Sequence, residues 1–349
     1  MSAMESTKLK SENRMHIGFV YDLRNEYLAH GYTKEETAEF DNEITIDAIT
    51  QIMESMGHQV DRIGNIKQLV VRLAAGDRWN LVFNLAEGLY GIGRESQVPA
   101  LLDAYQIPYT FSDPVTLALT MDKAYTKRIL RDAGLPTAPF EVVKRLSDCD
   151  ALMLPFPLFA KPIAEGTGKG ITSASRVETP MELRNTCQRL LTQFNQPVLV
   201  ESFLSGRDFT VGILGGGAKA RAIGTLEIKL SPSAELWCYS YQNKQSFDYV
   251  DSQLVTDDAA QQAAYFALQA HRVLGCRDAS RVDLRADHQG QLYILEINAL
   301  SGLQPAFSDL PCLANLAGIS YTQLIVSILK SAFERYGLCG ETIDNVATQ

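Results

Sequence analysis

Apolar positions in the first third of the chain predict strands that alternate with helices. Residues 16–23 (HIGFVYDL) form an apolar run of β-favouring residues, and residues 82–85 form a second, shorter run. Residues 44–56 repeat their apolar positions with the helical period, and residues 98–105 form a further helical segment. This alternation is typical of a parallel sheet with helices on its faces.

The middle of the chain is predicted to contain one helix and two strands. Residues 121–133 have helical periodicity, and Gly134 follows them as a C-cap. Residues 140–144 and 158–161 are strand-like, and the second segment is followed by the glycine-rich loop EGTGKGIT. We therefore expect this loop to lie at the end of a strand.

The last part of the chain alternates strands with two helices. The strand segments are VLVESFL, DFTVGIL, RAIGTLEI and LYILEIN, and the helices are expected over residues 259–274 and 321–335. Because 349 residues exceed the usual size of a single core, we expect several packed units. These are a disordered tail (residues 1–14), an N-terminal α/β domain (15–115), a central subdomain (116–197) and a C-terminal subdomain with the metal site (198–349).

Composition and charge narrow the class of protein. Hydrophobic residues make up 46% of the chain and charged residues 21%, which is ordinary for a soluble globular protein. The net charge of −9 argues against a nucleic-acid partner, and no apolar run approaches the roughly 20 residues that span a bilayer. The six cysteines are scattered without a CxxC pair and the N-terminus lacks an apolar signal, so we expect a cytoplasmic protein without a membrane partner.

Three oxygen-bearing side chains are predicted to share one face of a hairpin. The strands RVDLR and LYILEIN are joined by the turn DHQG, and alternate residues of a strand share a face, so Glu296 and Asn298 point the same way. Asp283 on the neighbouring strand can point there too. Carboxylate and amide oxygens are the ligands that Mg²⁺ prefers beside nucleotide phosphates. The alternative is a solvated strand face, but the apolar neighbours Leu295 and Ile297 would make an unpaired Glu296 costly there.

The glycine-rich loop and the lysine before it are candidates for phosphate binding. Lys161 ends a strand and supplies a point charge, and the loop that contains Thr167 and Gly168 offers backbone N–H groups. The loop matches neither GxxxxGKS/T nor GxGxxG, so it is not a Walker loop or a dinucleotide fingerprint. A plain β-turn is the alternative for this loop on its own.

The segment VLVESFLSGRDFTV is a candidate adenosine site. An apolar strand runs into Glu201, Phe203 and Leu204, where exposed backbone groups beside apolar side chains could hold the edge of an adenine. Asp208, after the following turn, could bind a ribose. A structural connection between two strands is the alternative on physical grounds alone.

Lined up in order, five segments resemble the ATP-grasp superfamily, specifically its D-alanine–D-alanine ligase branch. They are MDKAYTKRILRDAGLPT, FAKPIAEGTGKGIT, LVESFLSGRDFTVGIL, RVDL and ILEINALSGL, and the resemblance covers nearly the whole chain from His16 onward. It implies an α/β (α+β) ATP-grasp fold, in which an N-terminal parallel-sheet domain and two α+β subdomains clasp ATP. It also implies a homodimeric, ADP-forming carbon–nitrogen ligase that acts on small molecules and uses ATP with two Mg²⁺ ions, for which Mn²⁺ could substitute.

The same resemblance implies a role for each candidate residue. The nucleotide would be bound by the phosphate lysines Lys123 and Lys161, the adenine-pocket residues Glu201, Phe203 and Leu204, and the ribose ligand Asp208. The metal ions would be bound by Asp283, Glu296 and Asn298. Lys244 would contact the γ-phosphate, and Arg281 and the backbone of Gly302 would stabilise the oxyanion of a tetrahedral intermediate.

The chemistry of this set is that of an ATP-driven ligase. A carboxylate is a poor electrophile because its oxygen would have to leave as oxide, whereas an acyl phosphate carries a good leaving group. Transfer of the γ-phosphoryl group requires charge neutralisation and in-line positioning rather than a protein nucleophile. Lysines, an arginine and paired Mg²⁺ ions supply that neutralisation, and no Ser–His–Asp or Cys–His arrangement stands out among only five histidines.

The residues expected to orient the first D-alanine depart from the family pattern. D-alanine ligases have GGxSxER after the first strand, where this chain has YDLRNEYLAHGY. The expected histidine after VFN is Glu87, the tyrosine after the loop lysine is Gln245, and the serine beyond the metal-binding asparagine aligns with Phe307. Because the nucleotide half is kept and these sites are not, we predict a changed acceptor specificity rather than a loss of activity.

These departures resemble a divergent subgroup of the family, for which we consider a mycosporine-like amino acid ligase. Such an enzyme joins serine or threonine to mycosporine-glycine, with ATP activating a ring ketone oxygen as its enol and the amine forming an imine. The acceptor is acidic and polar, so Arg24, Arg94 and Glu87 are predicted contacts. Solvated surface charge is the alternative for the two arginines.

Two other functions are kept open by the sequence. A D-alanine–D-alanine ligase or another dipeptide ligase would share the fold and the nucleotide site, because one fold supports many activities. A non-catalytic nucleotide-binding regulator is the third function, but such a protein needs no oxyanion donor such as Arg281.

Overall fold

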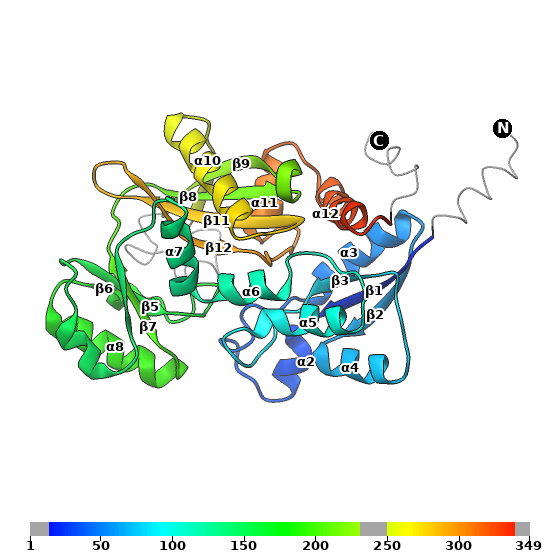
Figure 1. Cartoon of the computed structure of the whole chain (residues 1–349), viewed down its shortest axis with the longest axis horizontal. Helices are drawn as coiled ribbons and strands as arrows, with labels where there is room; N and C mark the ends of the chain where they lie inside the picture. The colour runs from blue at the N-terminus through cyan, green and yellow to red at the C-terminus, as the bar shows by residue number, and fades with distance from the viewer. Residues whose placement is uncertain (1–13, 231–249, 339–349) are drawn as a thin grey trace, which may run out of the picture.

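Three β-sheets, each covered by helices, make up residues 14–230 and 250–338, which are the residues that the computed structural model describes. Figure 1 shows a parallel sheet at one end of the molecule, a small antiparallel sheet at the other, and a larger antiparallel sheet between and above them. This mixture of parallel and antiparallel sheets with helices confirms the predicted α/β (α+β) class.

The N-terminal sheet has the strand order β2-β1-β3, and its strands are parallel. Its strands are β1 (His16–Tyr21), β2 (Gln59–Gly64) and β3 (Leu81–Leu85), and its helices are α2 (Arg24–Ala29), α3 (Glu43–Ser55), α4 (Ile66–Ala74) and α5 (Gln97–Ala104). Strands β1 and β3 and helices α3 and α5 lie where the apolar pattern predicts them. The pattern does not predict β2, because only its last two residues are buried and no apolar run marks it.

The central sheet has the order β4-β7-β5-β6 and is antiparallel. Its strands are β4 (Phe140–Val143), β5 (Leu158–Pro162), β6 (Arg176–Val177) and β7 (Val198–Ser202), and α8 (Pro180–Phe194) covers it. We expected β7 to begin the C-terminal subdomain, but it pairs with both β4 and β5 and therefore belongs to this sheet. Its four consecutive buried residues fit a strand that has a neighbour on each side.

The C-terminal sheet has the order β10-β9-β8-β11-β12 and is antiparallel. Its strands are β8 (Asp208–Leu214), β9 (Arg221–Leu230), β10 (Val250–Leu254), β11 (Ala279–Ala286) and β12 (Leu292–Asn298), and its helices are α10 (Asp258–Val273), α11 (Asp309–Leu316) and α12 (Tyr321–Arg335). Helix α12 packs against α3, and both contribute to one apolar core with β1 and β3. This shared core fixes the N-terminal sheet relative to the C-terminal one.

The helix predicted over residues 121–133 is confirmed as α7 (Lys123–Asp132), and it is preceded by α6 (Pro114–Met121), a helix that the pattern did not predict. Asp122 alone separates the two helices. The Asp122 carboxylate accepts hydrogen bonds from the backbone N–H groups of Ala124 and Tyr125, so it caps α7. The break places Lys123 in the first turn of α7, where its side chain is buried beside Glu296.

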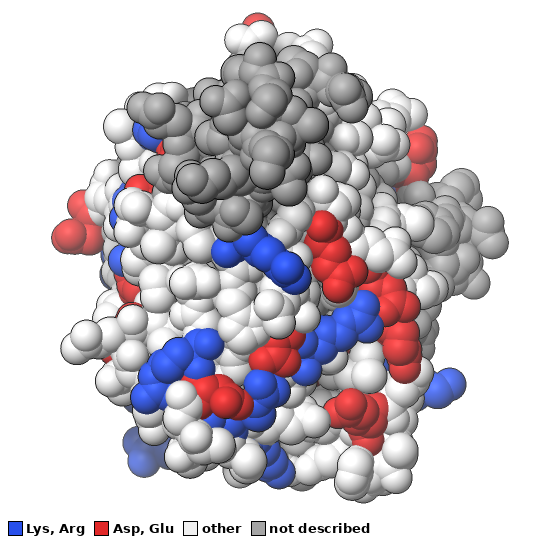
Figure 2. Space-filling view, turned by 90° about the vertical axis from the view of Figure 1, so that its right-hand side faces the viewer, with Lys and Arg blue, Asp and Glu red and all other residues white. Residues whose placement is uncertain are grey.

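The charged side chains on the face drawn in Figure 2 are mixed. Lysines and arginines lie next to aspartates and glutamates, and the described residues on that face form no extended basic patch of the kind that binds nucleic acid. Among the described helices, no single one has the length and apolar content needed to cross a membrane. Helices α11 and α12 meet those criteria only as a pair, and they are bent by 111° at their junction.

Candidate active site

Two adjoining cavities contain nearly all of the predicted site residues. The larger cavity, of about 350 Å³, is lined by Arg24, Glu87, Lys123, Thr167, Arg281, Glu296, Asn298, Gly302 and Phe307. The smaller cavity, of about 100 Å³, is lined by Lys161, Gly168, Glu201, Phe203, Leu204, Asp208, Asp283 and Glu296. Glu296 lines both cavities, so they meet at this residue. Arg94 is buried behind the larger cavity, and the predicted residues Lys244 and Gln245 lie outside the described residues.

The smaller cavity has a buried glutamate that holds two lysines. The Glu201 carboxylate at the end of β7 lies 2.7 Å from Lys161 Nζ and 2.8 Å from Lys127 Nζ. Burial disfavours the charge of Glu201, but the two ammonium groups outweigh burial and hold its pKa at about 2. Glu201 therefore fixes Lys161 in the cavity wall. Lys127 is absent from the predicted site, although its position one helical turn after Lys123 on α7 is a usable signal.

An aromatic wall lines the same cavity. The rings of Phe159 and Phe203 are stacked with their centroids 6.4 Å apart, and the Arg176 guanidinium lies 4.8 Å from the centre of the Phe203 ring. Leu204, which is buried, continues this wall beside Phe203. A flat apolar surface of this kind fits the face of a planar base.

The three predicted metal ligands meet on adjacent strands. Asp283 of β11 lies directly opposite Glu296 of β12, and Arg281 lies opposite Asn298, which confirms the predicted hairpin. Asn298 Nδ2 donates a hydrogen bond of 3.3 Å to Asp283, and Glu296 lies 3.2 Å from Lys123 Nζ. The oxygen-bearing side chains therefore converge and face one of the two predicted phosphate lysines.

This donor set fits a magnesium ion that nucleotide phosphates help to bind. Within residues 14–230 and 250–338, no three His, Cys, Asp or Glu side chains form a metal cluster by themselves. Asp283 and Glu296 supply two carboxylates, and Asn298 supplies an amide oxygen once its side-chain amide is turned. Magnesium usually takes one or two protein carboxylates and completes its octahedral shell with water and phosphate oxygens. The residues present therefore suit a nucleotide-bound Mg²⁺ rather than a cage made of protein alone.

The glycine-rich loop lies across the junction of the cavities. Thr167 lines the larger cavity and Gly168 the smaller one. Both have positive φ, +52° and +72°, and Gly170 follows with +74°. A Cβ atom on Gly170 would lie 2.7 Å from the side chains of Phe194 and Pro162, so this tight turn requires glycine.

Arg281 is held rigidly at the wall of the larger cavity. Its Nη2 lies 2.9 Å from Asp283, and its Nη1 lies 3.1 Å from Asp309 in the first turn of α11. Gly302 lies close to α11, because a Cβ atom there would be 2.9 Å from Ser308 Oγ. Phe307 is at the cavity edge, and the neighbouring Ser308 also lines the cavity, one residue beyond the position where the sequence alignment looked for a serine. Asp309 and Ser308 are thus site residues that sequence reasoning missed.

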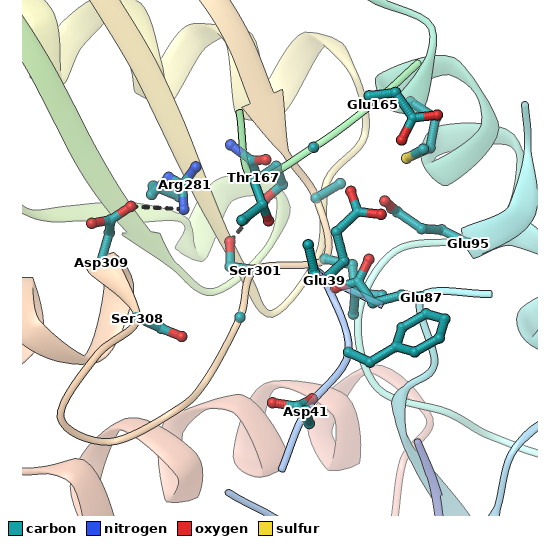
Figure 3. Close-up of a pocket in the computed structure, with 18 of the residues that line it drawn as sticks. Glu39, Asp41, Glu87, Glu95, Glu165, Thr167, Arg281, Ser301, Ser308 and Asp309 are labelled. Carbon is teal, nitrogen blue, oxygen red and sulfur yellow. Dashed lines mark hydrogen bonds and ion pairs between the residues drawn. The ribbon is translucent and has the colours of Figure 1, made fainter. Parts of the chain in front are cut away.

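The larger cavity also has an acidic side that the sequence did not predict. Besides Glu296 and Asp309, five carboxyl-bearing residues line the cavity: Glu39, Asp41, Glu87, Glu95 and Glu165. In Figure 3, the side chains of Glu39, Glu87 and Glu95 point toward one another from separate segments, while Arg281 and Asp309 lie across the cavity. Of the five, only Glu87 belongs to the predicted set, because the others lie in polar segments far apart in the chain.

Two of these carboxylates are already paired with cations of the protein. Glu39 lies 2.8 Å from Arg94 and 3.0 Å from Lys169, and Lys169 also pairs with Glu165. Arg94 additionally donates a hydrogen bond of 2.9 Å to the carbonyl oxygen of Ala164. These contacts tie the glycine-rich loop to the N-terminal domain. Arg94 is therefore buried and engaged, which excludes the alternative of a solvated surface charge.

Arg24 is also engaged by the protein itself. Its Nε donates a hydrogen bond of 2.9 Å to the carbonyl oxygen of Thr37, and one Nη donates to that of Ala38. These bonds hold the segment that carries Glu39 into the cavity. Both arginines that we expected to contact an acidic substrate thus make their polar contacts within the protein.

The remaining three acidic side chains form no ion pair with a described Lys, Arg or His, although Arg94 and Lys123 lie near enough to Glu95 to favour its charge. Burial raises the pKa of Asp41 to about 7 and that of Glu95 to about 8. Burial, followed by repulsion from Glu95 and Glu39, raises the pKa of Glu87 well above its ordinary value. The charge of Glu95 disfavours ionisation of Glu87, so the two carboxyl groups do not readily carry full charge together. We call Asp41, Glu87 and Glu95 the acidic wall.

Glu95→Gln is expected to raise the melting temperature by a few degrees at about pH 9 and to leave it unchanged near pH 4. The folded-state pKa of Glu95, about 8, is raised above the ordinary 4.5, so the folded protein binds a proton that the unfolded chain has lost. The stability of the wild-type protein therefore falls as the pH rises through this window, and glutamine, which does not ionise, avoids the loss. Melting curves across this pH range measure the effect, and Glu54→Gln on the exposed side of α3 is the control. Parallel pH profiles for Glu95→Gln and wild type would contradict the burial of an uncompensated carboxyl.

Comparison with known proteins places these features in context. A family model described as the C-terminus of D-ala D-ala ligase matches residues 129–330. The D-alanine–D-alanine ligase of Bordetella avium is 35% identical over 274 residues, which are 76% of this chain and 82% of that protein. The D-alanine–D-alanine ligase of Trichlorobacter lovleyi is 31% identical over 84% of this chain and 90% of its own length. An uncharacterized protein of Sinorhizobium fredii is 34% identical over 73% of this chain and 75% of its length.

Solved structures share the fold at lower identity. The D-alanine–D-alanine ligase of Bacillus anthracis in complex with ATP has a TM-score of 0.70 and 20% identity, covering 93% of this chain and 99% of that one. A D-Ala:D-Ser ligase from Enterococcus faecalis has a TM-score of 0.70 and 18% identity, covering 91% and 99% of the two chains. These similarities confirm the predicted fold over nearly the whole chain.

Proposed function

The chain belongs to the D-alanine–D-alanine ligase family and is an ATP-dependent carbon–nitrogen ligase, and from this premise we propose that it joins the carboxylate of one amino acid to the amine of another. The observation that carries the proposal is the meeting of two cavities at Glu296. The smaller cavity has an aromatic wall and Lys161, which suit a nucleotide. The larger one has Arg281 and room for small polar substrates.

The proposed reaction transfers the γ-phosphoryl group of ATP to a carboxylate oxygen of the first amino acid. Lys161 and Lys123, both buried, neutralise phosphate oxygens at the junction of the cavities. The amine of the second amino acid then attacks the carbonyl carbon of the acyl phosphate, the carbon–nitrogen bond forms, and phosphate leaves. Arg281, fixed by Asp283 and Asp309, stabilises the negative charge that develops on the carbonyl oxygen.

Magnesium bound by Asp283, Glu296 and Asn298 would neutralise further charge on the transferred phosphoryl group. Asp283 is oriented for that task, since it accepts a hydrogen bond of 2.9 Å from Thr210 and is paired with Arg281. Glu296 is oriented by Lys123. We propose two ions in this site, a number that rests on the family resemblance alone.

An amino-acid acceptor is a better proposal than mycosporine-glycine. The relatives from Bordetella avium and Trichlorobacter lovleyi are named as D-alanine–D-alanine ligases. The acidic wall would repel an acidic acceptor, and Arg24 and Arg94 make their polar contacts with the protein instead. The amino-acid ligase, which the sequence left as the alternative, is therefore the function we propose. Two carboxylates hold Arg281 at the cavity. This favours a catalytic function, because nucleotide binding alone needs no oxyanion donor.

Incubation with Mg·ATP and a panel of D- and L-amino acids tests this function. We expect ADP, phosphate and a new amide-linked product to form in equal amounts, only when a suitable amino acid is present, and EDTA to abolish all three. Coupled ADP detection and mass spectrometry of the product measure the outcome. Nucleotide binding without ADP release for any amino acid would favour a non-catalytic regulator. ADP release only with mycosporine-glycine would restore the acceptor considered from the sequence.

A further inference from the structure

We propose that the larger cavity binds an amino acid with a second cationic group, a diamino or guanidino acid, whose side-chain cation is held by the acidic wall of Asp41, Glu87 and Glu95. This inference rests on the proposed ligase function and names the class of its substrate. It rests on the position of the wall, the pairing of the carboxylates around it, and the burial of Glu95.

The ion pairs around the cavity do not include the residues of the acidic wall. Glu39 and Glu165 are matched by Arg94 and Lys169, which lie within ion-pair distance of both. No Lys, Arg or His among the described residues forms an ion pair with a residue of the acidic wall. The wall therefore keeps acceptor capacity for a cationic ligand.

The burial of the Glu95 side chain is a second observation that indicates a ligand at the wall. This side chain lines the cavity although the residue is only 8% exposed, and it forms no ion pair with a Lys, Arg or His among the described residues. A buried carboxyl without a cation lowers stability, so such a group is typical of a functional site.

The position of the wall fixes the orientation of the substrate. Figure 3 shows Glu87 and Glu95 across the cavity from Arg281 and Asp309. A substrate carboxylate belongs near Arg281 and Lys123, where the phosphoryl group arrives, so the opposite end of the molecule faces the wall. Asp41 also lines the cavity and is drawn below Glu87 in this view.

The number of carboxyl groups points to more than one cationic group. A single α-ammonium group neutralises one carboxylate, which would leave at least one further carboxyl of the wall buried and unpaired. A second ammonium or a guanidinium supplies several N–H donors and the missing charge. Lysine, ornithine and arginine have this chemistry, whereas alanine and serine do not.

Steady-state ADP release with matched amino acids tests the proposal. We expect kcat/KM for the best of lysine, ornithine and arginine to exceed that for alanine of the same configuration by about 100-fold, because a buried charge that lacks its partner is strongly disfavoured. Glu87→Gln and Glu95→Gln should lower this ratio by at least about tenfold. Glu54→Gln, on the exposed surface of α3, is the matched control and should keep the wild-type ratio.

Calorimetric titration with the same amino acids separates this inference from the ligase function. Binding of a cationic side chain should release about one proton near neutral pH, because burial raises the pKa of Glu95 to about 8 and a bound cation lowers it, and Glu95→Gln should remove that release. Three other charged groups lie near Glu95, namely Arg94, Lys123 and Glu39. They are unchanged in Glu95→Gln, so they affect the titrations of the wild type and the variant alike. ADP release with alanine at a rate equal to that with lysine, or lysine binding no tighter than alanine, would overturn the inference and leave the ligase function intact. Tight, Glu95-dependent lysine binding without ADP release from any amino acid would support the cation site and overturn the ligase function.

Discussion

Glu296→Gln is expected to lower the turnover number by about 10³-fold or more while the melting temperature changes by only a few degrees. Glu296 is the residue at which the two cavities meet, and it lies opposite Asp283 in the strand pair. Glutamine keeps the size of the side chain but removes the charge that would bind Mg²⁺ and that now orients Lys123 at 3.2 Å. Because phosphoryl transfer depends on charge neutralisation, the loss falls on the chemical step. ADP release at saturating substrates measures it.

Glu227→Gln is the matched control for this variant. Glu227 is also a strand glutamate in an ion pair, 2.8 Å from Arg207, and it lies outside both cavities. Its replacement should leave turnover within about twofold of wild type, as is usual for a substitution remote from the site. Wild-type turnover in Glu296→Gln would remove the metal assignment from β11 and β12.

Arg281→Lys is expected to lower the turnover number by about 10²- to 10³-fold with little change in the KM for ATP. The guanidinium reaches Asp283 and Asp309 at the same time and still faces the cavity. Lysine keeps the positive charge but has no planar fork, so it cannot keep both contacts and also present a donor to the developing oxyanion. An effect on turnover alone is the mark of an interaction that forms in the transition state.

Arg277→Lys controls for the loss of a guanidinium. Arg277 pairs with Asp113 at 2.6 Å and lines neither cavity. We expect this variant to retain turnover close to wild type. A larger change in the KM for ATP than in turnover for Arg281→Lys would instead make Arg281 a nucleotide ligand.

The nucleotide end of the site could be predicted from the sequence because its residues lie in short, regular segments. Asp283, Glu296 and Asn298 sit on two strands joined by a short turn, so the period of a strand is enough to place them on one face. Lys161 and the glycine-rich loop are likewise joined end to end. The local geometry of strands and turns is therefore enough to predict most of the nucleotide site.

The acidic side of the larger cavity could not be predicted in the same way. Glu39 precedes α3, Glu95 lies in a short turn before α5, and Glu165 opens the glycine-rich loop. Only the packing of the three sheets brings these segments together, and a glutamate in a polar segment gives no sign that it is buried. Arg94 is an example. From the sequence it could have been an exposed surface arginine, but it is only 6% exposed.

The elements absent from the prediction have a related physical cause. Strand β2 is an edge strand with mostly exposed or half-buried residues, so it lacks an apolar run. The break between α6 and α7 depends on Asp122, whose capping role becomes clear only from its hydrogen bonds. In both places, the bounds of the element depend on tertiary packing or on a single side chain. The hydrophobic period of the sequence does not show either of them.

Transfer of an oxygen label from substrate to phosphate tests most directly whether ATP activates a carboxylate at the junction of these cavities. The amino acid that supports the fastest ADP release would be labelled with ¹⁸O in its carboxylate and incubated with Mg·ATP, and the phosphate products would be analysed by ³¹P NMR or mass spectrometry. Activation as an acyl phosphate places one labelled oxygen in inorganic phosphate and none in a nucleotide. Unlabelled phosphate, or label recovered in AMP, would contradict the account.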